Sequence, residues 1–480
     1  MEYILKGYEP ANLFRYFEEI SAIPRGSGNE KGVADYLVRF AEEHGLRWYK
    51  DDLYNVAIFR DAAPGMENKE PLMLQAHIDM VCEKNKGVDH DFEKDGIRLI
   101  EKNGFLTADG TTLGADDGAG VVMILAVLAD KSLKTPRIEA LFTSQEETGL
   151  GGAEYFDYSR LTAKKIINLD TDLENVAIAS CAGSLNLTFL ARPQFVPAVG
   201  QFMKVSILGL AGGHSGGDIH LGRKNSILLL GAILTALYEE EPFNLVSLEG
   251  GNKRNAIPRE AEAVICVSDR EKAAASVKKI AAAFYPLLVR EDRGLRVHAS
   301  KCAKQPEMAT YKDTSAILSF LSLIPNGVIG MSASKPGLVE TSSNLGVVRT
   351  ANGVFDFSVY TRSSVESEMD AAFLRMKRLA KVLDFEFVFV DRCPGWAFDP
   401  NSKLQKEFVS AFKKTFPDGP EPLVEAVHAG LECGIILEKM GGGDAISFGP
   451  NMKDIHTPDE TLDLHSVERV YKLLCAMIRE

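Results

Sequence analysis

Apolar residues in the first third of the chain form short, nearly continuous runs that alternate with helical stretches. The run 118–129 has the length and composition of a buried helix. The runs that predict strands are 54–59, 72–78, 137–144 and 165–170. Strands without alternation are buried on both faces, and strands separated by helices form mostly parallel sheets. The first third therefore predicts an α/β layer.

The pattern changes near residue 184. Segments 184–192 (SLNLTFLAR) and 354–362 (VFDFSVYTR) alternate apolar and polar residues, which predicts antiparallel strands with one solvated face. Helices are expected at 226–240, 271–288, 314–323 and 366–383. The repeated order of strands and helices favours an α+β domain of the ferredoxin-like type, present twice.

The last part of the chain returns to the first pattern, after a turn at Cys393-Pro394-Gly395. Helices are expected at 402–416, around 431–439 and from Val467, with a strand at 445–448. We therefore expect one α/β domain built from residues 1–183 and 393–480. A second domain, residues 184–392, is inserted between these parts.

Composition narrows the class of protein. With 54 Lys and Arg against 67 Asp and Glu, the net charge of −13 argues against nucleic-acid partners and anionic membrane surfaces. No apolar run is long enough to span a membrane, and no signal peptide is visible. The 7 cysteines are scattered without a CxxC pair, which is typical of a reduced, cytoplasmic protein. Any metal should therefore be held by histidine and carboxylate side chains.

The first candidate for chemistry is the segment QAHID at 75–79. Residues two apart on a strand point the same way, so His77 and Asp79 can act together. The imidazole could bind a metal while the carboxylate accepts its other N–H. The ordinary alternative is a capped surface histidine beside a turn.

Four further motifs place acids or a histidine near expected strand or helix ends. They are GADDGAG at 114–120, QEETG at 145–149, NLDTD at 168–172 and IHTPDE at 455–460. Alone, each has an ordinary interpretation as a helix cap or solvated surface. Adjacent residues on an extended chain point in opposite directions, so Glu146 and Glu147 could serve as a base and a ligand. Together, the motifs exceed one tetrahedral site and predict two ions, of zinc, manganese or cobalt, with a bridging carboxylate.

Two glycine-rich segments remain. The segment AGGHSGGD at 211–218 is most simply a turn, and it lacks the glycine patterns of nucleotide-binding loops. The segment GGGD at 441–444 is expected to line a pocket.

In this order, the motifs HID, GADDG, QEETG, NLDTD, GGHSGGD and DIHTPDE resemble those of the co-catalytic zinc exopeptidases related to glutamate carboxypeptidase and aminoacylase. The details GGHSGGDIH, RNAIPREAEA, IPNGV, HAGLECG and FGPNMKDIHTPDE look like the branch of the aminoacyl-histidine dipeptidases. The resemblance covers essentially the whole chain.

The resemblance implies roles for individual residues. His77, Asp116 and Asp170 would bind one metal ion, and Asp116 would bridge to a second ion. Glu147 and His456 would complete that second site. A cis peptide bond is expected after Asp116. The remaining implied roles are Glu146 as general base, Asp79 as the partner of His77, and His214, Asn255 and Arg362 as substrate-binding residues of the inserted domain, which would act as a lid.

The implied activity is metal-dependent hydrolysis of dipeptides, with Xaa-His dipeptides among the candidate substrates. Tripeptidases, carboxypeptidases and N-acyl amino acid deacylases with the same core remain alternatives. A non-catalytic binding protein and a two-metal phosphohydrolase are more distant alternatives. The resemblance also leaves open a homodimer formed through the lid, in which His214 would serve a partner's site.

Overall fold

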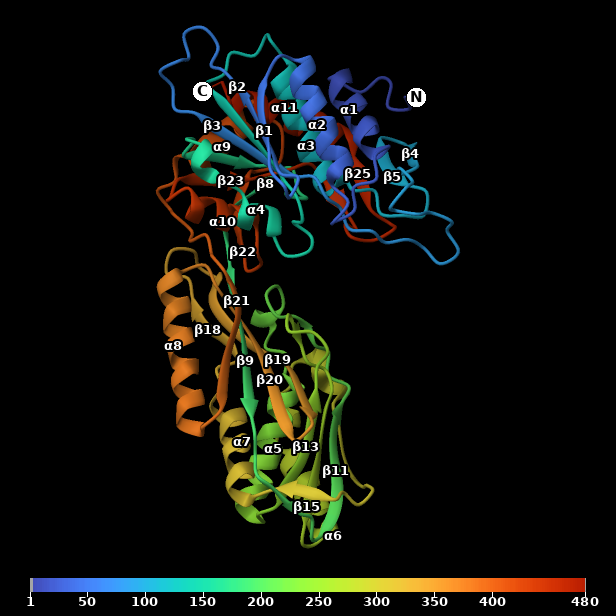
Figure 1. The fold of residues 1–480 in the computed structure, drawn as a ribbon, viewed down its shortest axis with the longest axis vertical. Coiled ribbons are helices and arrows are strands. Elements are labelled where there is room, and N and C mark those ends of the chain that lie inside the picture. Colours follow the sequence, from blue (N-terminus) through green and yellow to red (C-terminus); the bar gives the residue numbers. More distant parts are fainter. Residues whose placement is uncertain (1–2, 480) are drawn as a thin grey trace. The chain divides into compact units, whose positions relative to one another are not determined.

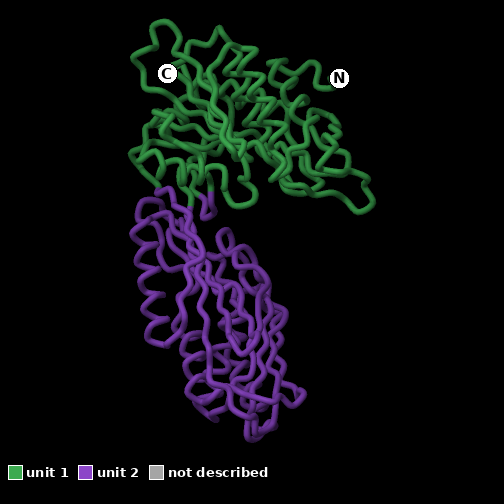
Figure 2. Tube along the Cα trace, in the orientation of Figure 1, with its two compact units in different colours: residues 1–181, 398–426, 431–480 green, residues 182–397, 427–430 purple. Residues whose placement is uncertain are grey.

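The computed structural model describes residues 3–479, which divide into two compact units (Figure 2). The first unit runs up to Cys181 and also contains Phe398–Ala426 and the residues from Leu431 onward. The second unit contains Ala182–Ala397 and Val427–Gly430. The short segment 427–430 thus joins the second unit although both of its flanks belong to the first, which no pattern in the sequence reveals.

The first unit is built on an eight-stranded sheet. In sheet order its strands are β1 (Arg47–Lys50), β2 (Val56–Arg60), β6 (Ile138–Thr143), β3 (Leu72–His77), β7 (Lys165–Asn168), β23 (Asp444–Ser447), β8 (Val176–Cys181) and β22 (Leu423–Val427). The central strands β6, β3, β7 and β23 are parallel, and β1, β2 and β8 pair antiparallel. The expected α/β class with a mostly parallel sheet is confirmed.

Helices pack against this sheet, and its strands β3 and β6 are therefore buried along their whole length (Figure 1). Leu72, Leu74 and Ala76 of β3 share one core with α1, α2, α3, α9 and α11. The residues that alternate with these three along β3 point away from that core. The bounds of the helices are α1 (Ala11–Ser21), α2 (Lys31–Glu43), α3 (Ala115–Ala129), α4 (Gly151–Tyr155), α9 (Lys403–Thr415), α10 (Glu432–Lys439) and α11 (Leu464–Met477).

A second sheet of the first unit lies beside the C-terminal motif. It has the order β24 (Met452–Lys453), β25 (Thr461–Asp463), β5 (Phe105–Ala108) and β4 (Leu99–Lys102). The turn between β24 and β25 carries His456, whose backbone has a positive φ of 64°. This small sheet therefore fixes the position of the C-terminal histidine.

The second unit contains a nine-stranded antiparallel sheet. Its main path is β16 (Arg296–Lys301), β11 (Gln201–Leu208), β15 (Ala261–Val267), β13 (Asn244–Gly250), β19 (Val339–Ala351), β20 (Val354–Ser363), β9 (Gly183–Ala191) and β21 (Glu386–Cys393), with β18 (Gly327–Met331) on β19. Numbered in chain order within each half, these strands read 4-1-3-2 and then 2-3-1-4. That is the ferredoxin-like order twice.

Four helices cover one face of this sheet and share its apolar core. They are α5 (Ser226–Glu240), α6 (Arg270–Ala282), α7 (Tyr311–Leu323) and α8 (Glu366–Leu383). The opposite face carries polar pairs such as Lys204 with Glu262, as the alternating pattern predicts. Helix α6 ends at Ala282 instead of 288, and a 3-10 turn that contains Pro286 follows. Proline lacks the N–H that would continue the helix.

Within residues 3–479, no helix is long and apolar enough to cross a membrane.

Asn225 connects a helix end to the sheet in the second unit. Its side-chain oxygen accepts from the N–H groups of Ile227 and Leu228 at 3.0 and 3.2 Å, and its amide donates to the Leu345 carbonyl at 2.9 Å. We expect Asn225→Ala to lower the free energy of unfolding by about 2 kcal/mol, because it removes both the cap and a buried donor. Urea unfolding followed by circular dichroism measures this loss.

Asp269 provides the matched control, because it caps α6 in the same unit but is exposed. Asp269→Ala should cost about 1 kcal/mol or less. Equal losses in the two variants would contradict the role assigned to the buried amide.

Candidate metal centre

His77 ends strand β3, and its side chain is only 1% exposed. Its Nε2 lies 3.1 Å from Asp116 Oδ1, and its Nδ1 lies 3.5 Å from Asp79 Oδ1. Asp79 is fully buried and accepts from Ser27 Oγ at 2.8 Å and from the Glu146 N–H at 3.0 Å. The strand end thus presents the imidazole toward Asp116 with a carboxylate behind it.

Asp116 lies in the loop that opens α3, and a buried carboxylate holds this loop. Glu460 accepts from four consecutive backbone N–H groups, those of residues 113–116, at 2.8 to 3.3 Å. From the other side, Arg25 donates to the carbonyl oxygens of Ile78, Asp79 and Gly114. The peptide bond between Asp116 and Asp117 is cis, as expected. The loop of Asp116 and the end of β3 are therefore held together through backbone groups.

The two glutamates of the loop after β6 enter the site differently. Glu147 Oε1 lies 3.1 Å from His456 Nε2, which also lies 3.0 Å from Asp116 Oδ2. Glu146 makes no such contact with His456. Its pKa is raised well above the ordinary value, first by burial and then by the neighbouring charges of Asp170 and Glu432.

The side chains converge on two sets of possible ligand atoms. His77, Asp116 and Asp170 form one set, and Asp116, Glu147 and His456 form the other. Within each set the ligand atoms lie within 4.8 Å of one another, and Asp116 belongs to both. His77 also forms a set with Glu146 and Glu147. Imidazole nitrogen and carboxylate oxygen, without thiolate, are suitable ligands for zinc, manganese or cobalt.

The electrostatics of the cluster favour positive charge. Hydrogen bonds with Asp116 and Glu147 raise the pKa of His456 to about 10, against the effect of burial. Burial alone would lower the pKa of His77, but contacts with Asp116 and Asp79 raise it well above its ordinary value. The field of the carboxylates therefore attracts a cation to this position, and a divalent ion meets that requirement.

A buried polar network that the sequence patterns did not predict lies next to the cluster. Glu432 is fully buried and accepts from Gln75 Nε2 at 2.6 Å and from Thr143 Oγ1 at 2.8 Å. Gln75 in turn accepts from Asn168 Nδ2 at 2.6 Å. Burial raises the pKa of Glu432 to about 7. A polar Gln75 in the middle of an apolar strand was the available signal for this network.

The three residues expected to bind substrate gather in the second unit. His214 belongs to β12 (Gly213–His214), which pairs with β14 (Ala256–Ile257) directly after Asn255. The Asn255 carbonyl accepts from the Ser215 N–H at 2.9 Å. Arg362 lies on β20, and its Nη2 is 3.4 Å from His214 Nε2. Residues about 150 positions apart in the chain thus become neighbours.

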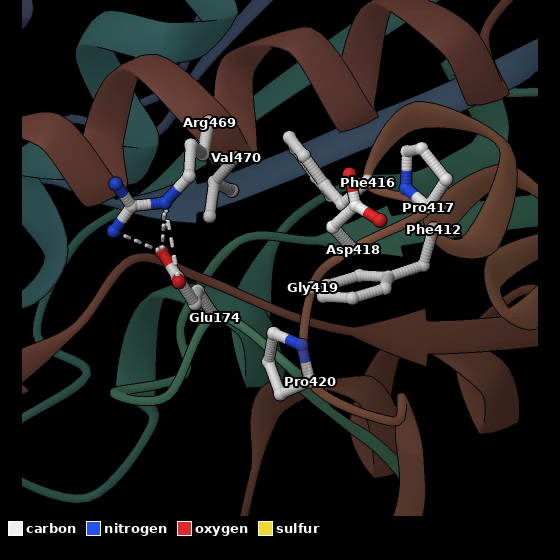
Figure 3. Close-up of a pocket in the computed structure, with 9 residues that line it drawn as sticks. All are labelled: Glu174, Phe412, Phe416, Pro417, Asp418, Gly419, Pro420, Arg469 and Val470. Carbon is white, nitrogen blue, oxygen red and sulfur yellow. Dashed lines mark hydrogen bonds and ion pairs between the residues drawn. The ribbon is translucent and has the colours of Figure 1, made fainter.

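Two other features lie away from this cluster. Asp444 of the GGGD segment accepts from Ser402 Oγ and from the first N–H groups of α9, so it acts as a helix cap instead of lining a pocket of the site. A pocket of about 310 Å³ in the first unit contains none of the expected site residues (Figure 3). Arg469 at its rim is paired with Glu174 at 2.9 Å. Its lining residues are Glu174, Phe412, Phe416, Pro417, Asp418, Gly419, Pro420, Arg469 and Val470.

The chain is similar over nearly its whole length to known proteins. The cytosol non-specific dipeptidase of Escherichia coli (strain K12) is 35% identical over 483 residues, which cover 99% of both chains. The crystal structure of aminoacylhistidine dipeptidase from Vibrio alginolyticus matches with a TM-score of 0.92 and 34% identity, covering 98% of this chain and 97% of that one. Aminopeptidase PepT from Bacillus cereus, at 16% identity and a TM-score of 0.55 over 98% of each chain, shares the fold.

Residues 73–480 match the family described as peptidase family M20/M25/M40. The matched range includes both sets of ligand atoms and the whole of the second unit. The chain therefore belongs to the M20/M25/M40 family of peptidases.

Proposed function

We propose that the protein is a metal-dependent dipeptidase that binds two divalent ions, of which zinc is the first candidate. The observation that carries the proposal is the position of Asp116, whose two carboxylate oxygens lie about 3 Å from different histidines, His77 and His456. One carboxylate can thus serve both ions. The likeness to two dipeptidases over nearly the whole chain supports the substrate class.

The ligand roles follow the two sets of atoms. His77, Asp116 and Asp170 would hold one ion, and Asp116, Glu147 and His456 the other. Ions bound there would lower the pKa of water and polarise the carbonyl group of the scissile peptide bond. Asp79 would keep His77 in the tautomer that presents Nε2 to the metal, since it faces Nδ1.

Glu146 would act as the general base. Its carboxylate takes a proton from the attacking water and delivers it to the leaving amine. A raised pKa suits this exchange, because the group must accept and then release the same proton.

His214 would stabilise the negative charge that develops on the carbonyl oxygen. Its Nδ1 accepts from the Gly217 N–H at 3.0 Å, so its proton lies on Nε2, which can donate. Arg362 would bind the substrate carboxylate with its planar guanidinium, and Asn255 would add a polar contact.

A partner subunit is not needed to bring His214 and Arg362 together, because both belong to one unit of one chain. A homodimer through this unit is compatible with the proposal. By similarity to its cytosolic relative, we place the protein in the cytoplasm.

A substrate panel tests the proposal against its alternatives. Purified protein loaded with Zn²⁺ is assayed on dipeptides that include Xaa-His, on tripeptides, and on N-acyl amino acids. We expect kcat/KM to be highest for dipeptides with free termini. Faster hydrolysis of N-acyl amino acids would make it a deacylase, and faster hydrolysis of tripeptides would make it a tripeptidase.

Removal of the metal should abolish the activity. We expect dialysis against a chelator to reduce hydrolysis of the best dipeptide to background, and added Zn²⁺, Mn²⁺ or Co²⁺ to restore it. Metal content is measured by mass spectrometry before and after dialysis. Full activity in protein shown to be metal-free would rule out the proposed mechanism.

The neighbouring glutamates allow a paired test of base and ligand. Glu146→Gln should retain both metal ions and lose activity by about 10²- to 10⁴-fold in kcat, since only the proton acceptor is removed. Glu147→Gln should instead bind less metal, because it removes a ligand atom.

Metal content and kcat are measured on both variants, with thermal unfolding as the control for folding. If Glu146→Gln lost metal in proportion to its activity, Glu146 would be a ligand and the general base would have to be another group.

A further inference from the structure

Arg362 is a nearly buried cation without an acidic partner. Its side chain is 6% exposed, and among residues 3–479 no carboxylate lies within ion-pair distance of it. The guanidinium instead lies over the ring of Tyr360, 4.6 Å from its centroid. A buried guanidinium that lacks an internal anion is placed to receive one from outside.

His214, a polar neighbour of Arg362, is also a donor. Because His214 carries its proton on Nε2, the 3.4 Å separation from Arg362 Nη2 joins two donors and is no hydrogen bond. Two neighbouring donors favour negative charge on a bound substrate, which a peptide offers as its carboxylate at Arg362 and its developing oxyanion at His214.

A second histidine reaches the same place from the short segment 427–430. His428 Nε2 lies 2.7 Å from Ser342 Oγ, and Ser342 pairs directly with Arg362 across β19 and β20. Residues paired in this way have their side chains on one face of the sheet. Burial, and then the charge of Arg362, lower the pKa of His428 to about 4, so its imidazole is neutral near pH 7.

The groups around Gly216 pack closely and leave several polar atoms unused. A Cβ at Gly216 would lie 2.2 Å from the His428 carbonyl oxygen and 3.2 Å from Arg362 Nε, so only glycine lets segment 427–430 approach this closely. Three buried atoms nearby have no hydrogen-bond partner within the described chain: Ser215 Oγ, Arg362 Nε and His428 Nδ1. If Ser342 donates to Nε2, then His428 Nδ1 is a third donor of this cluster without a partner in the described chain.

We propose that His428 is a specificity-determining residue, whose Nδ1–H binds the C-terminal carboxylate of the substrate together with Arg362. This inference rests on the proposed function and narrows it: the site would select peptides with a free carboxylate over the corresponding amides. His428 was not among the residues expected to bind substrate.

The test compares alanyl-alanine with alanyl-alanine amide on metal-loaded protein. His428→Gln removes the donor at Nδ1, whereas His428→Asn keeps an amide donor near that position. His298→Gln is the matched control, since His298 is an exposed histidine of the same unit. We expect His428→Gln to raise KM for the dipeptide about tenfold or more with little change in kcat, and to leave KM for the amide unchanged.

The ratio of kcat/KM for the dipeptide to kcat/KM for its amide should therefore fall about tenfold in His428→Gln. It should be largely retained in His428→Asn and in His298→Gln. Thermal unfolding verifies that the variants fold. An unchanged ratio in His428→Gln, equal losses for both substrates, or a loss that His428→Asn shares in full would overturn the inference.

Calorimetric binding separates this inference from the proposed function. Both peptides are titrated into Glu146→Gln protein, with and without His428→Gln. Suppose that the wild-type protein hydrolyses no dipeptide, but that the preference for the carboxylate depends on His428. This result would support the binding role of His428 and contradict the proposed dipeptidase function. Binding without any preference for the carboxylate would overturn the binding role, whatever the activity.

Discussion

The structure of the first unit depends on the repulsion among carboxylates that are buried close together. Asp79 and Asp117 are fully buried, Asp116 is nearly so, and the charges of Asp170 and Glu146 reach the same space. Such charges cannot remain in a low-dielectric interior without compensation. Part of the compensation comes from Arg25 and from imidazoles, and the ions proposed above would supply the rest.

Backbone groups hold the loop of Asp116 against the end of β3. Four N–H groups of one loop donate to Glu460, and the guanidinium of Arg25 donates to carbonyl oxygens just after β3. Both contacts run through the main chain, so they fix the loop of Asp116 and leave its carboxylate oxygens free for His77 and His456. Arg25 thus contributes both to the geometry of the site and to the compensation of its charge.

Sequence patterns predicted the sheet and the ligand-bearing motifs because both depend on local order. A buried parallel strand is a continuous apolar run, and its end carries the polar residue that faces the site, as His77 does on β3. Glu460, Gln75 and His428 were missed, since their partners lie far away in the chain, up to 357 residues for the pair of Gln75 and Glu432. The assignment of segment 427–430 to the second unit has the same origin. Local patterns contain no information on such contacts.

The duplicated order of the second unit explains how one chain assembles the cluster around Arg362. His214 comes from the first ferredoxin-like half and Arg362 from the second, and the two halves meet where β13 pairs with β19 at Gly250 and Val348. At this join, a Cβ on Gly251 would lie 1.9 Å from the Gly346 carbonyl oxygen, and Gly251 has a φ of +67°. Only glycine permits that approach of two backbones. The spacing of the two halves, and with it the position of His214 beside Arg362, is therefore set by backbone contact at the join, so that neither half could form this cluster alone.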